Sequence, residues 1–408
     1  MKFSCIPLND TLQQNLKSLE YIEATDIQQQ AIPFITAGND VMARAKTGTG
    51  KTAAFALPIF DGLIADKTRD NKLSALVLAP TRELVQQIHA SFTQYGLNTG
   101  INVVAVFGGV SINPQLSKIA EGVDIIIATP GRLLDILTNS PLSLQDLSVL
   151  VFDEADRMLD LGFKAEIDQI VEQAPKSRQT LLFSATIDDS IYKLSKTLLN
   201  NPKIITVDDK TEVAEGVEQL VYTVDADRKR ELLSYLIGSR NWQQVLIFTR
   251  TKQTADALAK EMCKDGIKSQ SLHGDKSQGA RDKALLDFKS GKVRALVATD
   301  VAARGIDIID LAFVVNYELP YVAEDYVHRI GRTGRAGKTG LALSLVSPSE
   351  EWLLTAIEKV IDTRLLQQWL PGYEPDLTKI EKPKSSGNKK NARKQALQKT
   401  NGKTRRRR

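Results

Sequence analysis

One stretch constrains this chain more than any other feature: residues 45–52, which read AKTGTGKT. It follows the apolar run Val41–Ala43 and precedes an apolar helical pattern, so a buried strand turns into a helix here. The two glycines allow the backbone to curl until successive N–H groups and the helix N-terminus point at one anion. Lys51 supplies a charge for nucleotide phosphates, and the Thr52 hydroxyl suits magnesium. The stretch therefore predicts a phosphate-binding loop.

One position of this loop departs from the general pattern, which has glycine where this chain has Ala45. The alternative interpretation is a tight turn rich in glycine and threonine with a surface lysine. The strand-loop-helix context favours the phosphate-binding loop. Its predicted nucleotide-binding residues are Thr47, Gly48, Thr49, Gly50, Lys51 and Thr52.

Length and composition limit the class of protein. The 408 residues predict two or three domains. No run approaches the ~18 apolar residues of a membrane span, and the N-terminus lacks the apolar segment of a signal peptide. We therefore expect a cytoplasmic protein that has no membrane partner. Cys5 and Cys263 lie far apart, and the three histidines lack metal-ligand spacing, so neither a disulfide framework nor a zinc site is indicated.

The hydrophobic pattern predicts an α/β fold. Up to Val207, continuous apolar runs such as Val149–Phe152 alternate with helical stretches. Continuous apolar character indicates strands covered on both faces, hence a doubly wound parallel sheet flanked by helices. The alternation stops in the polar segment 208–217 and then restarts. We predict two such domains in tandem, 1–207 and 218–370, a linker at 208–217 and a disordered tail at 371–408; only the first domain has a phosphate-binding loop.

The positive net charge belongs to the tail. Of the chain's 54 Lys and Arg residues, 12 lie in 382–408, which holds none of the 49 Asp and Glu residues. A terminal block of like charge is commonly a solvated arm that binds nucleic acid. The alternative is a tail that only aids solubility. The four consecutive arginines at 405–408 favour nucleic-acid binding.

Two acidic residues follow the predicted strand Val149–Phe152, in the sequence DEAD at 153–156. A phosphate-binding loop needs a partner acid to hold magnesium, and Asp153 is placed for that task. Glu154 is placed to polarise the attacking water. An isolated DEAD sequence can also be a helix N-terminus with favourable acidic side chains. The phosphate-binding loop makes the catalytic interpretation the stronger one.

These two motifs resemble the DEAD-box family of ATP-dependent RNA helicases, in which alanine is the usual first residue of the loop. The resemblance runs from about Phe3 to Ser347. Further motifs follow in family order: PTREL at 80–84, GG at 108–109, TPGR at 129–132, SAT at 184–186, Gln278 with Arg281, ATD at 298–300 through RGID at 304–307, and HRIGRTGR at 328–335. The resemblance implies two RecA-like domains, RNA as ligand and a bacterial type of member.

The resemblance also implies the groups that bind and hydrolyse ATP. Gln28 matches the family's adenine-reading glutamine, and an amide fits the N6/N7 edge of adenine. Magnesium is expected at Thr52 and Asp153, largely through water. The remaining implied groups are Phe3 against adenine, Asp307 at the ribose, and the arginine fingers Arg332 and Arg335. Phe3 could instead merely cover the domain surface, and Ala24 stands where the family often has proline.

Nine residues match family positions that line an RNA strand, and three match positions that couple the two sites. The RNA-binding set is Thr81, Arg82, Gly108, Gly109, Thr129, Arg132, Gln278, Arg281 and Thr299. The coupling set is Ser184, Thr186 and His328. Such groups contact phosphate and 2′-OH without reading bases, so binding should not depend on sequence. His328 could also be a structural histidine, and Ser184 and Thr186 could cap a helix.

The sequence thus predicts a monomeric, RNA-dependent ATPase that separates short RNA duplexes or remodels ribonucleoprotein. Its partners are single-stranded RNA and short duplexes, and the ribosomal or RNA-degradation machinery is a candidate protein partner. Two rival hypotheses are an ATP-gated RNA clamp, whose output is binding, and a DNA helicase of the same superfamily. Hydrolysis should be slow until the two domains close, because the arginines come from the second.

Overall fold

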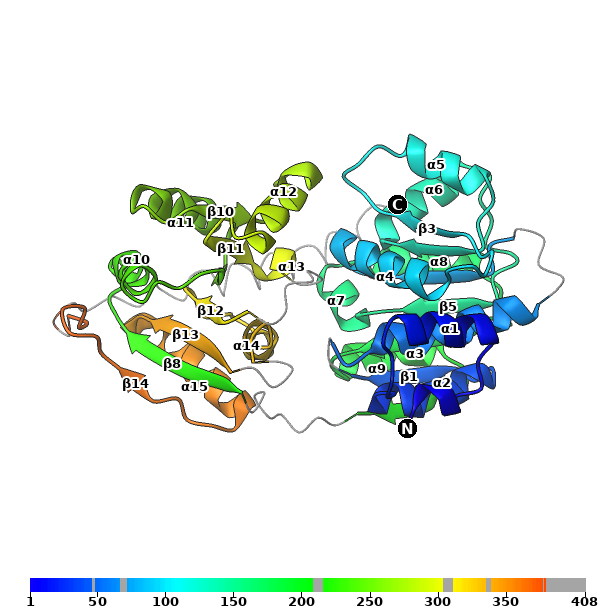
Figure 1. Ribbon diagram of the computed structural model, residues 1–408, viewed down its shortest axis with the longest axis horizontal. Helices are drawn as coiled ribbons and strands as arrows, with labels where there is room; N and C mark the ends of the chain where they lie inside the picture. The colour runs from blue at the N-terminus through cyan, green and yellow to red at the C-terminus, as the bar shows by residue number, and fades with distance from the viewer. Residues whose placement is uncertain are drawn as a thin grey trace, which may run out of the picture. The chain divides into compact units, whose positions relative to one another are not determined.

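The computed structural model describes residues 1–45, 48–66, 72–207, 216–303, 311–334, 339–376 and 378. The chain divides into two compact units. In the described residues each unit is built on one seven-stranded parallel sheet (Figure 1), which confirms the predicted α/β fold with two RecA-like domains. No helix in these ranges is long and apolar enough to cross a membrane.

The first unit carries strands β1 to β7 and helices η1 to α9. The strands are β1 (Val41–Arg44), β2 (Ala75–Leu78), β3 (Val103–Val106), β4 (Ile125–Ala128), β5 (Val149–Phe152), β6 (Gln179–Ser184) and β7 (Lys203–Thr206). The helices are η1 (Phe3–Cys5), α1 (Asp10–Ser18), α2 (Asp26–Thr36), α3 (Lys51–Ala65), α4 (Arg82–Tyr95), α5 (Asn113–Ala120), α6 (Pro130–Asn139), α7 (Ala155–Asp160), α8 (Lys164–Gln173) and α9 (Asp189–Leu198).

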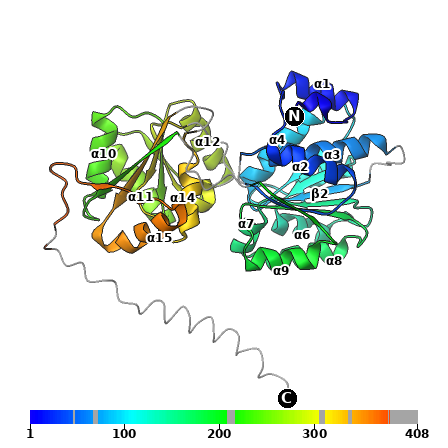
Figure 2. The ribbon, with the colours of Figure 1, turned by 90° about the horizontal axis from the view of Figure 1, so that it is seen from below.

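Helices cover both faces of the first sheet. The strand order is β3-β4-β2-β5-β6-β1-β7, and all neighbours are parallel. Side chains alternate along each strand, so Val77 packs with helices α1 to α4 while Leu76 packs with α5 to α9. Figure 2 shows these two helical layers. Burial on both faces explains why the strands are continuously apolar in the sequence.

The second unit repeats this plan. Its strands are β8 (Val217–Thr223), β9 (Val245–Thr249), β10 (Ser269–Leu272), β11 (Ala295–Thr299), β12 (Phe313–Asn316), β13 (Gly340–Val346) and β14 (Gln367–Gln368). The helices of this half of the chain are α10 (Lys229–Ser239), α11 (Lys252–Lys264), α12 (Gln278–Lys289), α13 (Asp300–Ala303), α14 (Ala323–Ile330), η2 (Pro348–Glu350) and α15 (Glu351–Ile361). The start of α12 and most of α13 belong to the first compact unit.

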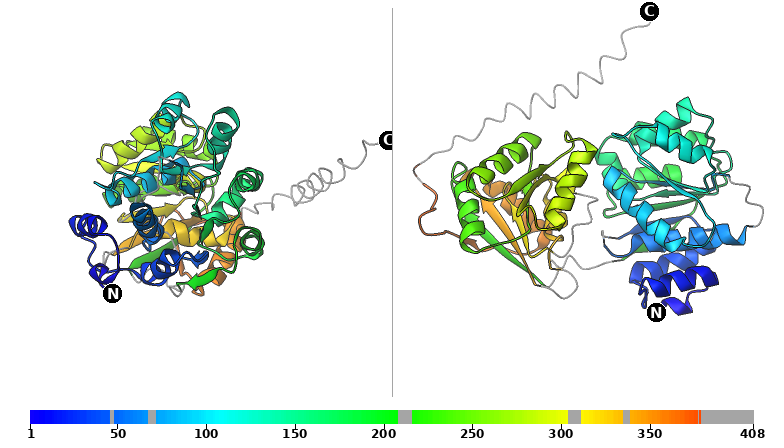
Figure 3. Two further views of the ribbon diagram at one scale, coloured as in Figure 1. Left: turned by 90° about the vertical axis from the view of Figure 1, so that its right-hand side faces the viewer. Right: turned by 45° about the horizontal axis from the view of Figure 1, so that its top comes forward.

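The strand order of the second sheet is that of the first with every number raised by seven: β10-β11-β9-β12-β13-β8-β14. Helices α10 and α11 pack on one face, and α14 and α15 pack on the other. These layers can be followed from two directions in Figure 3. The two sheets therefore have the same topology, although only β1 is followed by a phosphate-binding loop.

The structure differs from the sequence prediction at polar or peripheral segments. Val217, the last residue of the expected linker, begins β8. Strands β10 and β14 are polar, so the hydrophobic pattern did not indicate them. Residues at the start of the expected tail make defined contacts: Tyr373 packs on Tyr235, and the Asp376 N–H donates to Asp225. Apart from residue 378, the positions after 376 lie outside the described residues.

A buried ion cluster ties the second unit together. Lys229 on α10 is buried, and its Nζ donates to Glu350, to the Leu345 carbonyl at 2.7 Å and to the Tyr317 carbonyl at 3.1 Å. Arg250 Nη2 donates to the other Glu350 oxygen at 2.7 Å. Burial raises the pKa of Glu350, but the charges of Lys229 and Arg250 outweigh it, so the pKa lies below its usual value.

Replacing Glu350 with Gln should destabilise the second unit by ~3 kcal/mol, because Lys229 then stays buried without the carboxylate to which it is paired. All three tryptophans, Trp242, Trp352 and Trp369, lie in this unit, so their fluorescence during urea unfolding reports on it. The wild type should lose this contribution as pH falls through the depressed pKa, whereas E350Q should not. The control is Glu261→Gln, which breaks an exposed pair with Lys264. Equal unfolding midpoints for E350Q and E261Q would contradict the prediction.

Candidate functional site

The strand order places the chemical motifs along one edge of the first sheet. Strands β5, β6 and β1 are neighbours, and all run parallel. The loop at 48–52 follows β1, Asp153 and Glu154 follow β5, and Ser184 ends β6. Because the carboxyl ends of parallel strands lie at the same edge, motifs separated by more than 100 residues become adjacent.

Gln28 joins helix α2 to the phosphate-binding loop. Its Oε1 accepts from the Thr25 N–H at 2.8 Å, and its Nε2 donates to the Gly50 carbonyl at 3.1 Å. Gly50 has a φ of +90°, and a Cβ there would lie 2.4 Å from Gln28 Nε2, so only glycine fits. The two bonds leave one lone pair and one hydrogen of the amide, the groups that an adenine edge requires.

Lys51 and Asp153 form the buried charged centre of the site. Both side chains are almost fully buried, and Lys51 Nζ lies 3.8 Å from Asp153 Oδ1. Burial raises the pKa of Asp153 to about 6, against the opposing effect of Lys51. Within the described residues, Nζ has no hydrogen-bond partner. A buried ammonium group without an acceptor fits a phosphate ligand, and a carboxylate beside it fits magnesium.

Glu154 and Asp156 occupy special positions after β5. Glu154 has a φ of +53°, a left-handed conformation that non-glycine residues rarely adopt, and its N–H donates to Asp153 Oδ1 at 3.0 Å. Asp156 Oδ2 accepts from the Ala185 N–H at 3.1 Å, the Thr186 N–H at 3.1 Å and Thr186 Oγ1 at 3.2 Å. Asp156 thus binds the segment after β6 to the segment that carries Glu154.

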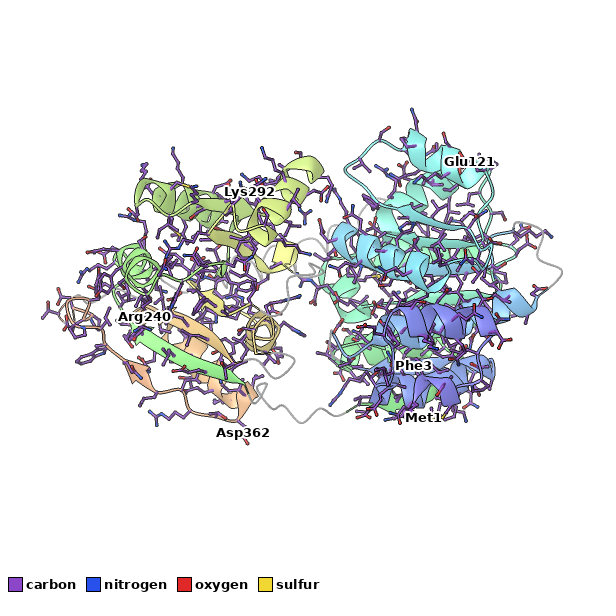
Figure 4. All side chains as sticks on the ribbon, in the orientation of Figure 1. Met1, Phe3, Glu121, Arg240, Lys292 and Asp362 are labelled. Atoms are coloured by element: carbon purple, nitrogen blue, oxygen red, sulfur yellow. The ribbon has the colours of Figure 1, made fainter. Side chains whose placement is uncertain are left out.

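Phe3 is buried in this structure. Its ring packs edge-on against Tyr21, with 5.5 Å between centroids, and only 2% of the residue is exposed. Figure 4 places it among the helices of the first unit. The ring offers no open face here, so its predicted contact with adenine stays a prediction and requires the ring to become uncovered.

The predicted RNA-binding residues of the first unit follow the other half of the sheet edge. Thr81 and Arg82 follow β2, Gly108 and Gly109 follow β3, and Thr129 and Arg132 follow β4. These strands are neighbours in the order β3-β4-β2. The first unit therefore collects two sets of predicted site residues on one edge, with β2 and β5 at the boundary between them.

The remaining predicted residues follow strands of the second sheet. Thr299 ends β11, while Gln278 and Arg281 lie in the first turns of α12, after β10, within the stretch 274–282 that belongs to the first compact unit. His328 lies in the last turn of α14, and Arg332 follows it with its carbonyl accepting from the Leu311 N–H at 3.1 Å. Thr47, Asp307 and Arg335 lie outside the described residues.

Arg329 lies between the predicted site residues His328 and Arg332, and the sequence interpretation gave it no role. Its guanidinium is 1% exposed and donates to both oxygens of Asp300, at 2.6 and 2.7 Å. It also donates to Asn316 Oδ1 and to the Glu318 carbonyl. Arg329 therefore anchors the segment that carries His328 and Arg332 to the ends of β11 and β12. Its position inside the motif at 328–335 was the only signal in the sequence.

Two family models match this chain. The model "DEAD/DEAH box helicase" matches residues 25–194, and the model "Helicase conserved C-terminal domain" matches residues 228–337. The first range contains the loop, the acidic pair and the segment at 184–186. The second contains Arg329 and Arg332.

Curated and solved proteins resemble the chain over most of its length. The ATP-dependent RNA helicase CshA of Listeria monocytogenes is 38% identical over 373 residues, which cover 91% of this chain and 71% of CshA. The CshA of Bacillus anthracis is 38% identical over 363 residues, 89% of this chain and 68% of that protein. A structure of S. cerevisiae Dbp5 bound to RNA and ADP BeF3 has a TM-score of 0.79 at 30% identity, covering 97% of this chain and 99% of that chain. A structure of the DEAD-box helicase Mss116 bound to ssRNA and UDP-BeF has a TM-score of 0.80 at 32% identity, covering 91% and 79%.

Proposed function

Because this chain belongs to the DEAD/DEAH box helicase family and is an ATP-dependent RNA helicase, we propose that RNA binding drives its two units into a closed form that hydrolyses ATP. Closure and hydrolysis are coupled to local separation of short RNA duplexes or to remodelling of ribonucleoprotein. Binding does not depend on base sequence, since the predicted contacts are backbone, hydroxyl and guanidinium groups.

One observation carries this proposal. The Lys51–Asp153 centre and the glycine loop at 108–109 follow strands of a single parallel sheet, on the same edge. A ligand bound at one half of the edge can therefore bias the strand ends that form the other half. Reciprocal coupling between ATP and RNA needs such a shared element.

The first unit holds ATP through Gln28 and the loop at 48–52, which includes Lys51. Magnesium, when bound, stabilises the negative charge that develops on the phosphates. Thr52 and Asp153 would hold it, largely through water, as is usual for magnesium beside phosphate. Glu154 orients the attacking water and accepts its proton. Asp156 couples this segment to Thr186, because the Thr186 hydroxyl donates to Asp156 Oδ2 at 3.2 Å.

The second unit supplies positive charge for hydrolysis. Arg332 is the proposed arginine finger, supported by Arg335 outside the described residues. Arg329 is bound to Asp300 and holds the preceding turn in place. Such fingers accelerate phosphoryl transfer by ~10³–10⁵. Hydrolysis without RNA should accordingly be slow, because the finger and the nucleotide belong to different units.

A strand-displacement assay on a short RNA duplex tests the proposal. We expect separation with ATP, none without nucleotide, and stimulation of ATPase by single-stranded RNA. The rival RNA clamp would bind RNA with ATP yet release no strand. A DNA helicase would be stimulated equally by matched DNA, which lacks the 2′-OH. Either result would replace the proposed activity with the corresponding rival.

The basic tail at 382–408 should strengthen RNA binding through phosphate contacts. Deleting it is expected to weaken binding and to reduce the slope of log affinity against log salt by ~0.7 for each lost contact with a single strand. Fluorescence anisotropy of labelled RNA at several salt concentrations measures both. A tail of the same composition in scrambled order is the control and should behave as the wild type, because phosphate contacts are not sequence-specific. An unchanged slope after deletion would refute this role.

The proposed setting is the cytoplasm, with the protein acting as a monomer on single-stranded RNA and short duplexes. Ribosomal or RNA-degradation machinery is the candidate source of protein partners. Sequencing RNA crosslinked to the protein in cells would identify the physiological substrate.

A further inference from the structure

Gln115 clamps the loop that carries the two glycines. It lies on α5 and is only 7% exposed, an unusual place for an uncharged polar side chain on a short surface helix. Its Oε1 accepts from the Phe107 N–H at 3.0 Å, while its Nε2 donates to the Phe107 carbonyl at 3.1 Å and to the Ser111 carbonyl at 3.1 Å. One amide therefore satisfies three backbone groups and ties the two ends of the segment 107–111 together.

The clamped loop supports two arginines of the predicted RNA site. Gly109 has a φ of +78°, and a Cβ there would lie 1.7 Å from Arg82 Nη1, so the Arg82 guanidinium rests directly on the backbone. Arg132 Nη2 donates to the Val110 carbonyl at 3.0 Å. The loop thus fixes guanidinium groups from α4 and α6, while Gln115 contacts it from α5.

We propose that Gln115 is a positioning residue for RNA binding, which acts by holding the segment 107–111 in the conformation that presents Arg82, Gly109 and Arg132. The inference rests on the proposed RNA site. Without the clamp, three backbone groups lose their partner and the loop samples other conformations. Part of the RNA-binding free energy is then used to order the loop, so the affinity for RNA falls. The rate of ATP hydrolysis by the RNA-bound protein is unaffected.

Replacing Gln115 with Glu tests this with minimal change in volume. The carboxylate can still accept from the Phe107 N–H, but it cannot donate, and it places negative charge against two carbonyl oxygens. We expect the RNA concentration for half-maximal ATPase to rise about tenfold, the size of change expected when buried backbone groups lose a hydrogen-bond partner. Maximal ATPase and the KM for ATP, both measured at saturating RNA, should stay within about twofold, because bound RNA then holds the loop in place.

The pH dependence of the variant separates positioning from general damage. Burial beside two carbonyl oxygens raises the pKa of an introduced carboxyl, and its protonated form can again donate one hydrogen bond. RNA affinity of Q115E, measured relative to the wild type by anisotropy, should therefore improve as pH falls through this raised pKa. A relative affinity that worsens as pH falls would count against the clamp.

Gln179 provides a matched control in the same unit. Its Nε2 also donates to two carbonyls, those of Ile35 at 2.9 Å and Asn39 at 2.6 Å, but it begins β6 and so lies at the opposite edge of the sheet. Q179E makes the same chemical change away from the predicted RNA site. We expect it to lower thermal stability to a similar extent and to leave RNA affinity unchanged.

The outcomes distinguish the inference from the proposed function. If the wild type shows no RNA stimulation, the RNA site itself is wrong. If the wild type responds to RNA but Q115E and Q179E have equal RNA affinities, Gln115 is only structural and the inference fails. Should Q115E not fold, Gln115→Met removes the same bonds without charge, and it must show the same selective loss of RNA affinity for the proposal to stand.

Discussion

Replacing Glu154 with Gln should reduce RNA-stimulated ATP turnover by ~10²–10⁴, because an amide of the same shape cannot take a proton from the attacking water. The backbone geometry of the site should survive, since the N–H of residue 154 still donates to Asp153. Affinity for ATP and RNA should persist, because Gln28, Lys51 and the glycine loop are unchanged. The variant is therefore expected to accumulate with both ligands bound.

Steady-state phosphate release with saturating RNA measures this effect, and anisotropy of labelled RNA with ATP confirms that the complex forms. Glu121→Gln is the control. This glutamate follows the last residue of α5, is exposed (Figure 4), and should tolerate the same change with full activity. Unchanged turnover in purified E154Q would overturn the assignment of the catalytic site.

Replacing Arg332 with Ala should lower maximal ATPase by ~10³ or more, the range found when an arginine finger is removed from phosphoryl transfer. Its backbone is pinned by the Leu311 N–H and preceded by the buried Arg329–Asp300 pair, so truncating the side chain should leave the segment in place. ATP binding without RNA should not change, because Lys51 and Gln28 belong to the first unit. Arg332→Lys retains charge but lacks the planar fork and should recover only part of the rate.

Single-turnover hydrolysis with saturating RNA and ATP isolates this step from binding. Arg240→Ala is the matched control in the second unit, since Arg240 is exposed at the end of α10 (Figure 4) and precedes β9. It should retain activity within about twofold, as surface substitutions away from a site usually do. If R332A hydrolyses ATP at more than half of the wild-type rate, Arg332 does not act as the finger.

Local sequence patterns predicted most of the fold because their physical cause is local. Continuous apolar runs such as Val149–Phe152 must be covered on both faces, which requires a parallel sheet with helices on each side. The prediction failed where the pattern was absent. Strand β10 is polar because it lies at the sheet edge, and β14 has only two residues.

Within the ATP site, the sequence indicated the chemistry of each group but not its neighbours. The loop at 45–52 and the acidic pair at 153–154 predicted a nucleotide and magnesium by their residue types and spacing. Nothing local says that Gln28 bonds to the Gly50 carbonyl, or that Phe3 is buried against Tyr21. Those facts depend on which helix packs beside the loop.

The sequence by itself determined the α/β class and the family, and it predicted which residues carry charge to ATP and RNA. Only the tertiary structure decided the strand order, which puts the two sets of predicted site residues on one sheet edge. It alone also assigned Gln115, Asp156 and Arg329 to the support of those sets. The physical reason is that a buried polar side chain takes its role from the carbonyl, amide or carboxylate groups that face it, and these come from distant parts of the chain.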